Sequence, residues 1–557
     1  MKISVKCTLL AAVLFASAAA SLAMQTAAIT AEGNAWWAHV QYLADDKLEG
    51  RDIGTPGFEL AAKYVESEFK SIGLKPAGVD GYREPVKLEA RSLVPDQTSL
   101  ALVRDGRQTP LVVGQDAALS PRGELNGTLD ASMVFVGYGM SIPEAGWDDF
   151  KGLNLKGKIA VYINAFPPVK VSDNVKSHVN TADERWLALK KAGAIGVATI
   201  AAPRPAGARG PAGGNAAGAA ARGGANAGAA RGGRGVAMPR PTVALADRAM
   251  VDAAGEKIAM SLTARGAAAV LAGTGHTVEE FDQLVADNKP IPTFAIPGSL
   301  KATAQLKEEP IESENIVGMV EGSDPKLKNE YIIMSAHLDH LGVGRPINGD
   351  SIYNGAMDDA SGIASLIETA RLLKASGVRT KRSVIFLAVT AEEKGELGSQ
   401  YFAYKPTVPF KDIVADLNLD MYLPLYPLKV IEVQGQAESS LGETAREAAH
   451  SQGVDVQTDR EPEQNRFIRS DQYSFIRHGI PALAFKFGYE FGSPEETIRK
   501  NWVRDVYHKP NDDVNQPVDK NAAALFDRVI MTLLQDVAND PRRPTWNADS
   551  FFRRFAK

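Results

Sequence analysis

The stretch RSVIFLAVTAEEKGELGS, residues 382–399, decides the fold class of this chain. It begins with an apolar run of strand length and ends with two adjacent glutamates, Glu392 and Glu393, before a glycine-containing turn. An apolar run without polar alternation is typical of a strand that is buried on both faces. Neighbouring side chains of a strand point in opposite directions, and those of a helix diverge, so the two glutamates are predicted to do different work.

The alternation of strand and helix continues on both sides of this stretch, from residue 315 onward. Strands are predicted in YIIMSAHLDH, residues 331–340, and in DIVADLNLDMY, residues 412–422, with a helix in ASGIASLIETARLLKAS, residues 360–376. This pattern predicts an α/β fold, an open mixed sheet flanked by helices. In such sheets the functional residues lie just beyond the carboxyl ends of the strands.

The first 23 residues are predicted to be a secretory signal peptide. Lys2 and Lys6 precede an apolar run over residues 8–20, and Ser21-Leu22-Ala23 forms a small-x-small cleavage site. An uncleaved membrane anchor is the weaker alternative, because the run is shorter than the roughly 20 apolar residues that a span needs. The mature protein is therefore expected in the periplasm or outside the cell, with no stable membrane insertion after cleavage.

Composition excludes several classes of protein. The chain has 557 residues, 45% of them hydrophobic and 23% charged, which predicts a globular protein of more than one domain. Cys7, the only cysteine, lies in the predicted signal, so a metal of the mature chain must be held by His, Asp and Glu. Without Lys2 and Lys6 the chain carries 60 basic and 67 acidic residues, a net charge of −7. This balance gives no reason to expect nucleic acid or an anionic membrane as a partner.

The middle of the chain is predicted to be an inserted β-rich domain, residues 94–284, because short apolar runs there are broken by Gly, Pro and Asp. Within it, residues 202–241 are nearly all Ala, Gly, Arg and Pro and are predicted to form a mobile surface loop. Their Arg-Gly-Gly units also suit a single-stranded nucleic-acid tract, a reading that export and acidity disfavour. The other predicted domain, which contains the α/β pattern, comprises residues 24–93 and 285–545, with a tail at 546–557.

Acids and histidines follow the predicted strands. His337 and Asp339 end the strand predicted in residues 331–340, Glu392 and Glu393 follow the apolar run within residues 382–399, and Asp420 ends the strand predicted in residues 412–422. Asp358 and Asp359 precede the predicted helix, and His508 lies far downstream. Two imidazoles with an excess of carboxylates and no thiol suit zinc or a related divalent metal. Two neighbouring metals would need one bridging carboxylate and an imidazole and a carboxylate each, which these residues can supply. One glutamate of the pair could then bind metal while the other accepts a proton from the attacking water.

Five motifs, in order and spacing, resemble peptidase family M28, which contains dizinc aminopeptidases and glutamate carboxypeptidases. They are SAHLDHLG (335–342), GAMDDASG (355–362), TAEEKGELGS (390–399), NLDM (418–421) and YHKPND (507–512). LEGRDIGTPG, residues 48–57, resembles the N-terminal helix junction of that family. VFVGYG (134–139), DDFKGLNLKGKIAVY (148–162) and ALKKAGAIGVATI (188–200) resemble an inserted protease-associated domain.

The resemblance implies a role for each residue of these motifs. It assigns one zinc to His337, Asp358 and Asp420, and a second to Asp358, Glu393 and His508, with Co²⁺ or Mn²⁺ as substitutes. It also implies that Glu392 is the general base, that Asp339 holds the ring of His337, and that the peptide between Asp358 and Asp359 is cis. Arg469, in FIRSDQYSFIRHGIPALAF (467–485), and Tyr507 are the candidate substrate contacts. His340 is expected to be structural or exposed.

The predicted function is that of an exported dizinc exopeptidase acting on peptides, an aminopeptidase. A carboxypeptidase of the glutamate-releasing kind is the nearest alternative and would need a cluster of cations around the substrate carboxylate, which Arg469 alone does not supply. A non-catalytic receptor on the same fold is an alternative of another class, and the presence of every implied ligand and the base disfavours it. The sequence leaves the oligomeric state open.

Overall fold

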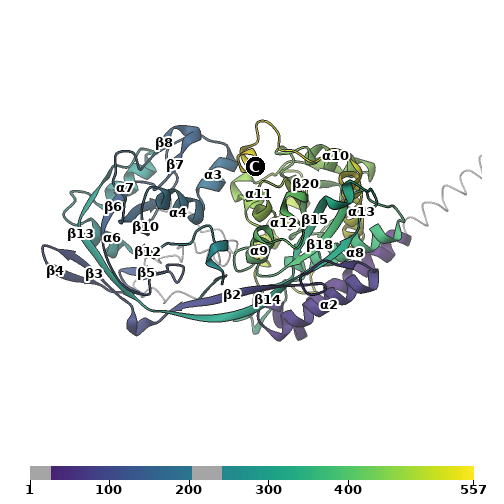
Figure 1. Cartoon of the computed structure of the whole chain (residues 1–557), viewed down its shortest axis with the longest axis horizontal. Coiled ribbons are helices and arrows are strands. Elements are labelled where there is room, and N and C mark those ends of the chain that lie inside the picture. The colour runs from purple at the N-terminus through teal and green to yellow at the C-terminus, as the bar shows by residue number, and fades with distance from the viewer. Residues whose placement is uncertain (1–26, 203–240, 557) are drawn as a thin grey trace, which may run out of the picture.

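A computed structural model describes residues 27–202 and 241–556 (Figure 1). The predicted signal peptide and nearly all of the Ala/Gly/Arg-rich stretch lie outside these residues. No helix in the described ranges is both long enough and apolar enough to cross a membrane.

A ten-stranded mixed sheet forms the larger lobe. Its strands, in spatial order, are β11 (Thr242–Leu245), β2 (Arg83–Leu93), β14 (Leu306–Val320), β18 (Ser383–Val389), β15 (Tyr331–His337), β19 (Ile413–Asn418), β22 (Ala482–Phe487), β20 (Val430–Gln434) and β21 (Asp455–Gln457), and β1 (Lys75–Pro76) pairs with β14. The central strands β18, β15, β19 and β22 run parallel, whereas β14 and β20 join them antiparallel.

Strand β18 explains the apolar run from which the fold was predicted, because all seven of its residues are buried. Val384, Phe386 and Ala388 pack into the core on one face of the sheet. Ile385 and Leu387 pack into the core on the opposite face. A strand buried on both faces has no position for a charged side chain, so the first charged residues come after the strand ends.

Helices cover both faces of this sheet. One face packs against a helix over residues 27–43, α2 (Pro56–Ile72), α8 (Ser361–Ala375), α10 (Leu441–Ser451) and α13 (Lys520–Asn539). The other face packs against α9 (Leu397–Tyr404) and α11 (Gln472–Arg477), while α12 (Pro494–Asp505) lies near the centre of the lobe in Figure 1. Helix α2 ends at Gly73, which adopts φ 78° as its cap. The predicted fold class is confirmed.

A second, eight-stranded sheet forms the smaller lobe. Its order is β4 (Arg107–Leu111), β3 (Ser99–Arg104), β13 (Thr293–Ala304), β6 (Gly127–Val136), β9 (Ile159–Asn164), β10 (Gly196–Ala201), β12 (Ile258–Leu262) and β5 (Ala117–Leu119). Its helices are α3 (Asp173–Val179), α4 (Ala182–Lys191), α6 (Ala264–Leu271) and α7 (Val278–Ala286). Two small hairpins, β7 (Ser141–Ile142) with β8 (Trp147–Asp148) and β16 (Gly342–Ile347) with β17 (Asp350–Tyr353), complete the strands of the described ranges. Strand β13 begins beyond residue 284, and the predicted domain boundaries stay predictions.

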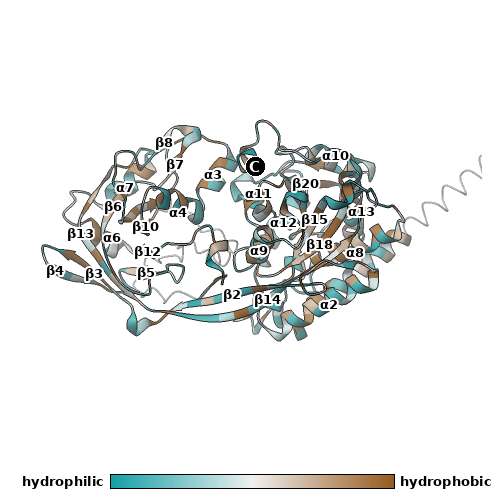
Figure 2. Cartoon of the chain, in the orientation of Figure 1, coloured by the Kyte–Doolittle hydropathy of each residue, from teal (hydrophilic) through white to brown (hydrophobic). Residues whose placement is uncertain are grey.

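Long strands connect the two lobes. Only Gln305 separates β13 of the smaller sheet from β14 of the larger one, and β2 pairs with β14 along eleven residues (Figure 1). Residues 307–314 of β14 are mostly polar, and Figure 2 shows this connection as largely hydrophilic. The C-terminal turn Phe551–Phe555 contacts both lobes, since Phe552 is buried beside Trp546 and Phe551 also packs near Val175.

Candidate metal centre

The carboxyl ends of three parallel strands supply four of the predicted site residues. His337 is the last residue of β15, Glu392 and Glu393 follow β18, and Asp420 follows β19. In the register of these strands His337 lies opposite Val389, and Ser335 lies opposite Asn418. Parallel pairing therefore brings residues that are far apart in sequence to one edge of the sheet.

Asp358 and His508 reach the same edge from outside the sheet. Asp358 lies in the turn Ala356–Ala360 before α8, and its peptide bond to Asp359 is cis, as the resemblance implies. His508 follows α12 with a left-handed φ of 55°. Asp512 links the two segments, because its carboxylate accepts the backbone N–H groups of Met357 and Asp358 at 2.9 and 3.1 Å.

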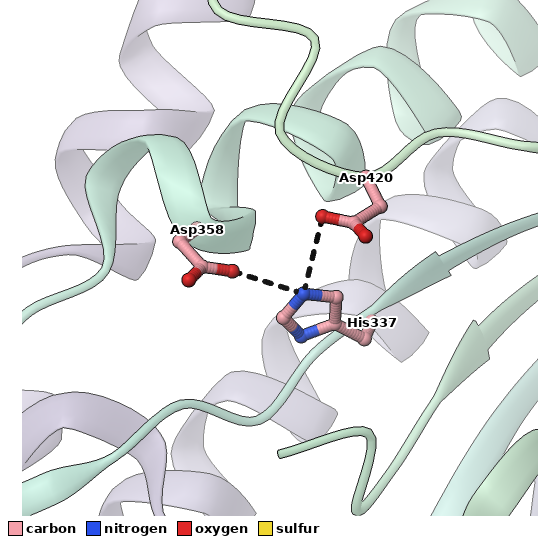
Figure 3. A group of neighbouring side chains, drawn as sticks. All are labelled: His337, Asp358 and Asp420. Carbon is pink, nitrogen blue, oxygen red and sulfur yellow. Dashed lines mark ion pairs between the residues drawn. The ribbon is translucent and has the colours of Figure 1, made fainter. Parts of the chain in front are cut away.

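His337, Asp358 and Asp420 form the first group of converging side chains (Figure 3). Nε2 of His337 lies 3.1 Å from Oδ1 of Asp358 and 3.8 Å from Oδ1 of Asp420. The other ring nitrogen, Nδ1, is 3.1 Å from the backbone carbonyl oxygen of Asp339. A bond from Nδ1–H to that carbonyl leaves the lone pair of Nε2 available to a cation that the two carboxylates also bind.

A second group surrounds the other oxygen of Asp358. Nε2 of His508 lies 3.0 Å from Oδ2 of Asp358 and 3.3 Å from Oε1 of Glu393. His340 also belongs to this group, since its Nδ1 lies 2.8 Å from Oε1 of Glu393 and 3.9 Å from Oδ2 of Asp358. Asp358 thus offers one carboxylate oxygen to each group, as a bridging ligand does.

The residues of both groups fit divalent metals. Oδ2 of Asp358, Oε1 of Glu393 and Nδ1 of His340 are buried and have no hydrogen-bond partner in the described ranges, although nitrogen and oxygen atoms approach within 2.8–3.3 Å. Such approaches without hydrogen-bond geometry arise when donor atoms point at a common centre rather than at one another. Buried carboxylates of this kind are stable when they pair with cations or coordinate a metal.

Electrostatics in the site support the same conclusion. Burial lowers the pKa of His337, but the carboxylates of Asp358 and Asp420 outweigh burial and raise that pKa well above its ordinary value. Burial raises the pKa of Glu393, but His508 and His340 outweigh it and hold this pKa well below its ordinary value. The low pKa keeps the carboxylate of Glu393 charged, which is the form of a carboxylate that coordinates a metal.

The two adjacent glutamates differ as the sequence predicts. Glu393 lies among the converging ligands, whereas Glu392 lines the neighbouring cavity together with Asp358 and Asp420. Burial, followed by the charges of Glu393, Asp471 and Asp420, raises the pKa of Glu392 well above its ordinary value, against the opposing effect of His337. Ala391, just before the pair, has φ 56°, so the turn after β18 is in a conformation that non-glycine residues rarely adopt.

Asp339 has a different role from the one implied by the resemblance. Its backbone carbonyl, not its carboxylate, contacts the ring of His337. The carboxylate instead accepts the backbone N–H groups of Glu392 and Glu393 at 3.0 and 3.3 Å. The role expected of its carboxylate is corrected accordingly, because the turn that follows β15 directs this side chain toward the end of β18.

The cavity beside the metal groups has a volume of about 400 Å³. Arg469 and Tyr507, the predicted substrate contacts, both line it. The ring of Tyr507 stacks on that of His508 with centroids 3.8 Å apart, and Nη1 of Arg469 donates to the carbonyl of Gln464 at 3.1 Å. Five further cations line the cavity: Arg466, Lys486, Arg499, Lys500 and Arg504.

Two further residues of the site were missed by sequence reasoning. His340, expected to be structural or exposed, is fully buried among the ligands. Arg51, within LEGRDIGTPG, is 1% exposed and donates to the carbonyl oxygens of Leu338, Asn354 and Gly355, which flank the ligands. The motifs contain both residues, but no spacing rule distinguishes a buried Arg or His in a loop from an exposed one.

Comparison with known proteins identifies one family. Residues 315–534 match the model of peptidase family M28. The chain is 28% identical over 257 residues to a probable leucine aminopeptidase 2 of Aspergillus oryzae, a match covering 43% of this chain and 48% of that protein. It is 33% identical over 133 residues to carboxypeptidase Q of Xenopus laevis, covering 23% and 26%.

Other similarities extend to bacterial proteins. Aminopeptidase YwaD of Bacillus subtilis is 26% identical over 251 residues, covering 44% of this chain and 50% of that protein. A solved aminopeptidase from Aneurinibacillus sp. strain AM-1 is 19% identical, with a TM-score of 0.48 and coverage of 93% and 97%. The chain spans half or less of the length of the three curated relatives. The chain thus carries a domain of peptidase family M28 over residues 315–534, the region that holds all five predicted metal ligands.

Proposed function

We propose that this chain is an exported dizinc exopeptidase, an aminopeptidase that removes N-terminal residues from peptides. The observation that supports the proposal is the convergence of His337, Asp358 and Asp420 with Glu393 and His508 beside a cavity that Glu392 also lines. Export rests on the N-terminal sequence alone.

In this proposal two metal ions are held by five residues, of which Asp358 is shared. One ion would be held by His337, Asp358 and Asp420, the other by Asp358, Glu393 and His508, with Co²⁺ or Mn²⁺ able to replace zinc. Bound metal of this kind polarises a carbonyl oxygen and lowers the pKa of water. Asp358 sets the spacing of the two groups, since it presents one carboxylate oxygen to each.

The other residues of the site act on the substrate and its protons. Glu392 takes a proton from the attacking water and returns it to the leaving amine, and its place on the cavity wall gives it access to both. Asp339 keeps Glu392 in position by accepting its backbone N–H. Tyr507 donates a hydrogen bond from its hydroxyl group to the carbonyl oxygen as negative charge develops there.

Glu392→Gln tests the proposal. The variant should lose about 10²- to 10⁴-fold in kcat, the usual contribution of a general acid–base, while it keeps its metal. Glu447→Gln, on the exposed surface of α10, is the matched control and should leave activity unchanged. Hydrolysis of aminoacyl anilides, lost in Glu392→Gln and after chelation, supports the aminopeptidase. A metal-loaded protein that hydrolyses no peptide, or a fully active Glu392→Gln variant, refutes the proposed function.

A carboxypeptidase of the glutamate-releasing kind is the second candidate, and the cavity wall favours it. Besides Arg469 it carries five other cations, each of which also lies within ion-pair distance of a carboxylate of the protein. Lys486 is buried and lies 3.9 Å from Asp420. Cations of this kind can bind a substrate carboxylate. Cleavage of N-blocked dipeptides ending in Glu, without cleavage of aminoacyl anilides, would decide for this candidate.

A further inference from the structure

His340 is a buried imidazole whose place in the site the family resemblance does not explain. Its side chain is 0% exposed, and neither ring nitrogen has a hydrogen-bond partner in the described ranges. Its ring lies edge to face against that of His508, with centroids 5.8 Å apart. Burying a polar side chain without a partner costs free energy, so the burial of this ring needs an explanation, such as a bound ligand.

The backbone makes room for this ring. Gly355 has φ 64°, and a Cβ at that position would lie 2.6 Å from Cγ and Cδ2 of His340 and 2.2 Å from the carbonyl oxygen of Asp358. Only a residue without a side chain lets the turn before Asp358 pass this close to the imidazole. The glycine thus holds His340 and Asp358 against each other.

The donor atoms around Nδ1 of His340 have the spacing of a metal coordination shell. Zinc bonds of about 2.0–2.2 Å in a tetrahedron put neighbouring donor atoms roughly 3.3–3.6 Å apart. The observed separations are 2.8 and 3.9 Å from His340 to Glu393 and Asp358, and 3.3 and 3.0 Å from His508 to the same two oxygens. These four values scatter around the tetrahedral spacing.

A simple ion pair between His340 and Glu393 explains the contact less well. The two atoms are 2.8 Å apart, yet both lack hydrogen-bond geometry with any partner in the described ranges. An imidazolium that paired with the carboxylate would direct its N–H at the oxygen. Two lone pairs directed at a third atom give a short distance without that geometry.

We propose that Nδ1 of His340 is a fourth protein ligand of the metal held by Asp358, Glu393 and His508. This inference rests on the proposed function, because it assumes that the site binds metal. The group then has four protein ligands, as closed zinc sites have, whereas the group of His337, Asp358 and Asp420 has three and keeps an open position. The two sites should differ in affinity, with the four-ligand site filling first.

X-ray absorption at the zinc edge of the metal-loaded protein tests this directly. The proposal requires three imidazoles for two zinc ions, from His337, His340 and His508. His340→Phe keeps the ring volume against His508 and removes the donor atom, so it should lose one imidazole from the spectrum. His450→Phe, whose side chain is 54% exposed, is the matched control and should retain all three.

Competition with a chelator gives a second readout without activity. His340→Phe should weaken the tighter site by at least about 10- to 100-fold, the range found when even a supporting partner of a metal ligand is removed. His340→Asn, which puts an amide oxygen near the position of Nδ1, should lie between the wild type and His340→Phe, and it serves if the Phe variant does not fold. Two imidazoles for two zinc ions in the wild type, or a folded variant with unchanged affinity, overturns the inference and leaves the proposed function standing. A wild-type chain that binds no zinc overturns both.

Discussion

Replacing the buried Arg51 by Met should destabilise the protein far more than the same change at an exposed arginine. The guanidinium group is buried and donates to four backbone carbonyl oxygens, those of Leu43, Leu338, Asn354 and Gly355, at 2.5–3.0 Å. It thereby ties the N-terminal helix to the segments that carry the predicted ligands. Methionine fills much of the same volume and satisfies none of these carbonyls.

The magnitude follows from two opposing contributions. Each hydrogen bond from a charged group contributes about 1.5–3 kcal/mol, so four bonds contribute roughly 6–12 kcal/mol. Burial lowers the pKa of Arg51 to about 10 against the charges of the nearby aspartates, which corresponds to a cost of about 3 kcal/mol for the buried charge. The balance is roughly 3–9 kcal/mol. We expect a loss of about 5 kcal/mol in the free energy of unfolding, below the middle of this range because neighbouring bonds are not additive.

Chemical denaturation, followed by circular dichroism, measures this loss. Arg446→Met is the control, because Arg446 is 53% exposed and pairs with Glu443 one helical turn away, a contact of at most about 0.5 kcal/mol. Arg51→Lys should fall between the two, since three ammonium donors cannot serve four carbonyls. If Arg51→Met unfolds within about 1 kcal/mol of the control, the carbonyls must find other partners, and the idea that Arg51 holds the site together is wrong.

Two further predictions concern Tyr507 and Glu84. Burial raises the pKa of Tyr507 well above its ordinary value, so its phenol stays protonated. Tyr507→Phe should lower kcat about 10²-fold with KM little changed. An unchanged kcat would show that Tyr507 takes no part in the reaction. Burial raises the pKa of Glu84 from 4.5 to about 7, against the opposing hydrogen bond from Asn315. Folding therefore favours the protonated form of Glu84, and the free energy of unfolding falls as pH rises from about 4.5 through 7. Glu84→Gln should therefore be more stable by up to about 3 kcal/mol at pH 8 and equal to the wild type near pH 4, and melting curves that differ equally at both pH values would contradict this.

The fold was predictable because its decisive signal is local. Six of the seven residues of β18 are apolar, all except Ser383 at its start, and burial on both faces of the sheet accounts for this. The convergence of His337, Glu393 and Asp420 was predictable for a related reason, since parallel pairing aligns the strand ends that precede them. These inferences need only the order of strands and helices.

His340 could not be placed by the same reasoning. The alternation of side chains along a strand ends with β15 at His337, and the direction of the next residues depends on the turn. The close approach of Gly355 to the ring, which fixes its position, joins residues with no shared pattern. Arg51 was missed for another reason: its partners are backbone carbonyls, which every residue has and no sequence pattern reveals.

The position of His508, the last predicted ligand along the chain, depends on a contact with the turn that carries Asp358. Asp512, four residues after His508, accepts the N–H groups of Met357 and Asp358, and its own carbonyl accepts that of Ala356. Three hydrogen bonds thus join the segment that carries His508 to the turn that carries the shared carboxylate. Because Asp358 belongs to both groups of ligands, the position of this segment bears on the geometry of both. The strand ends alone therefore set only part of the site, and the loop after α12 completes it.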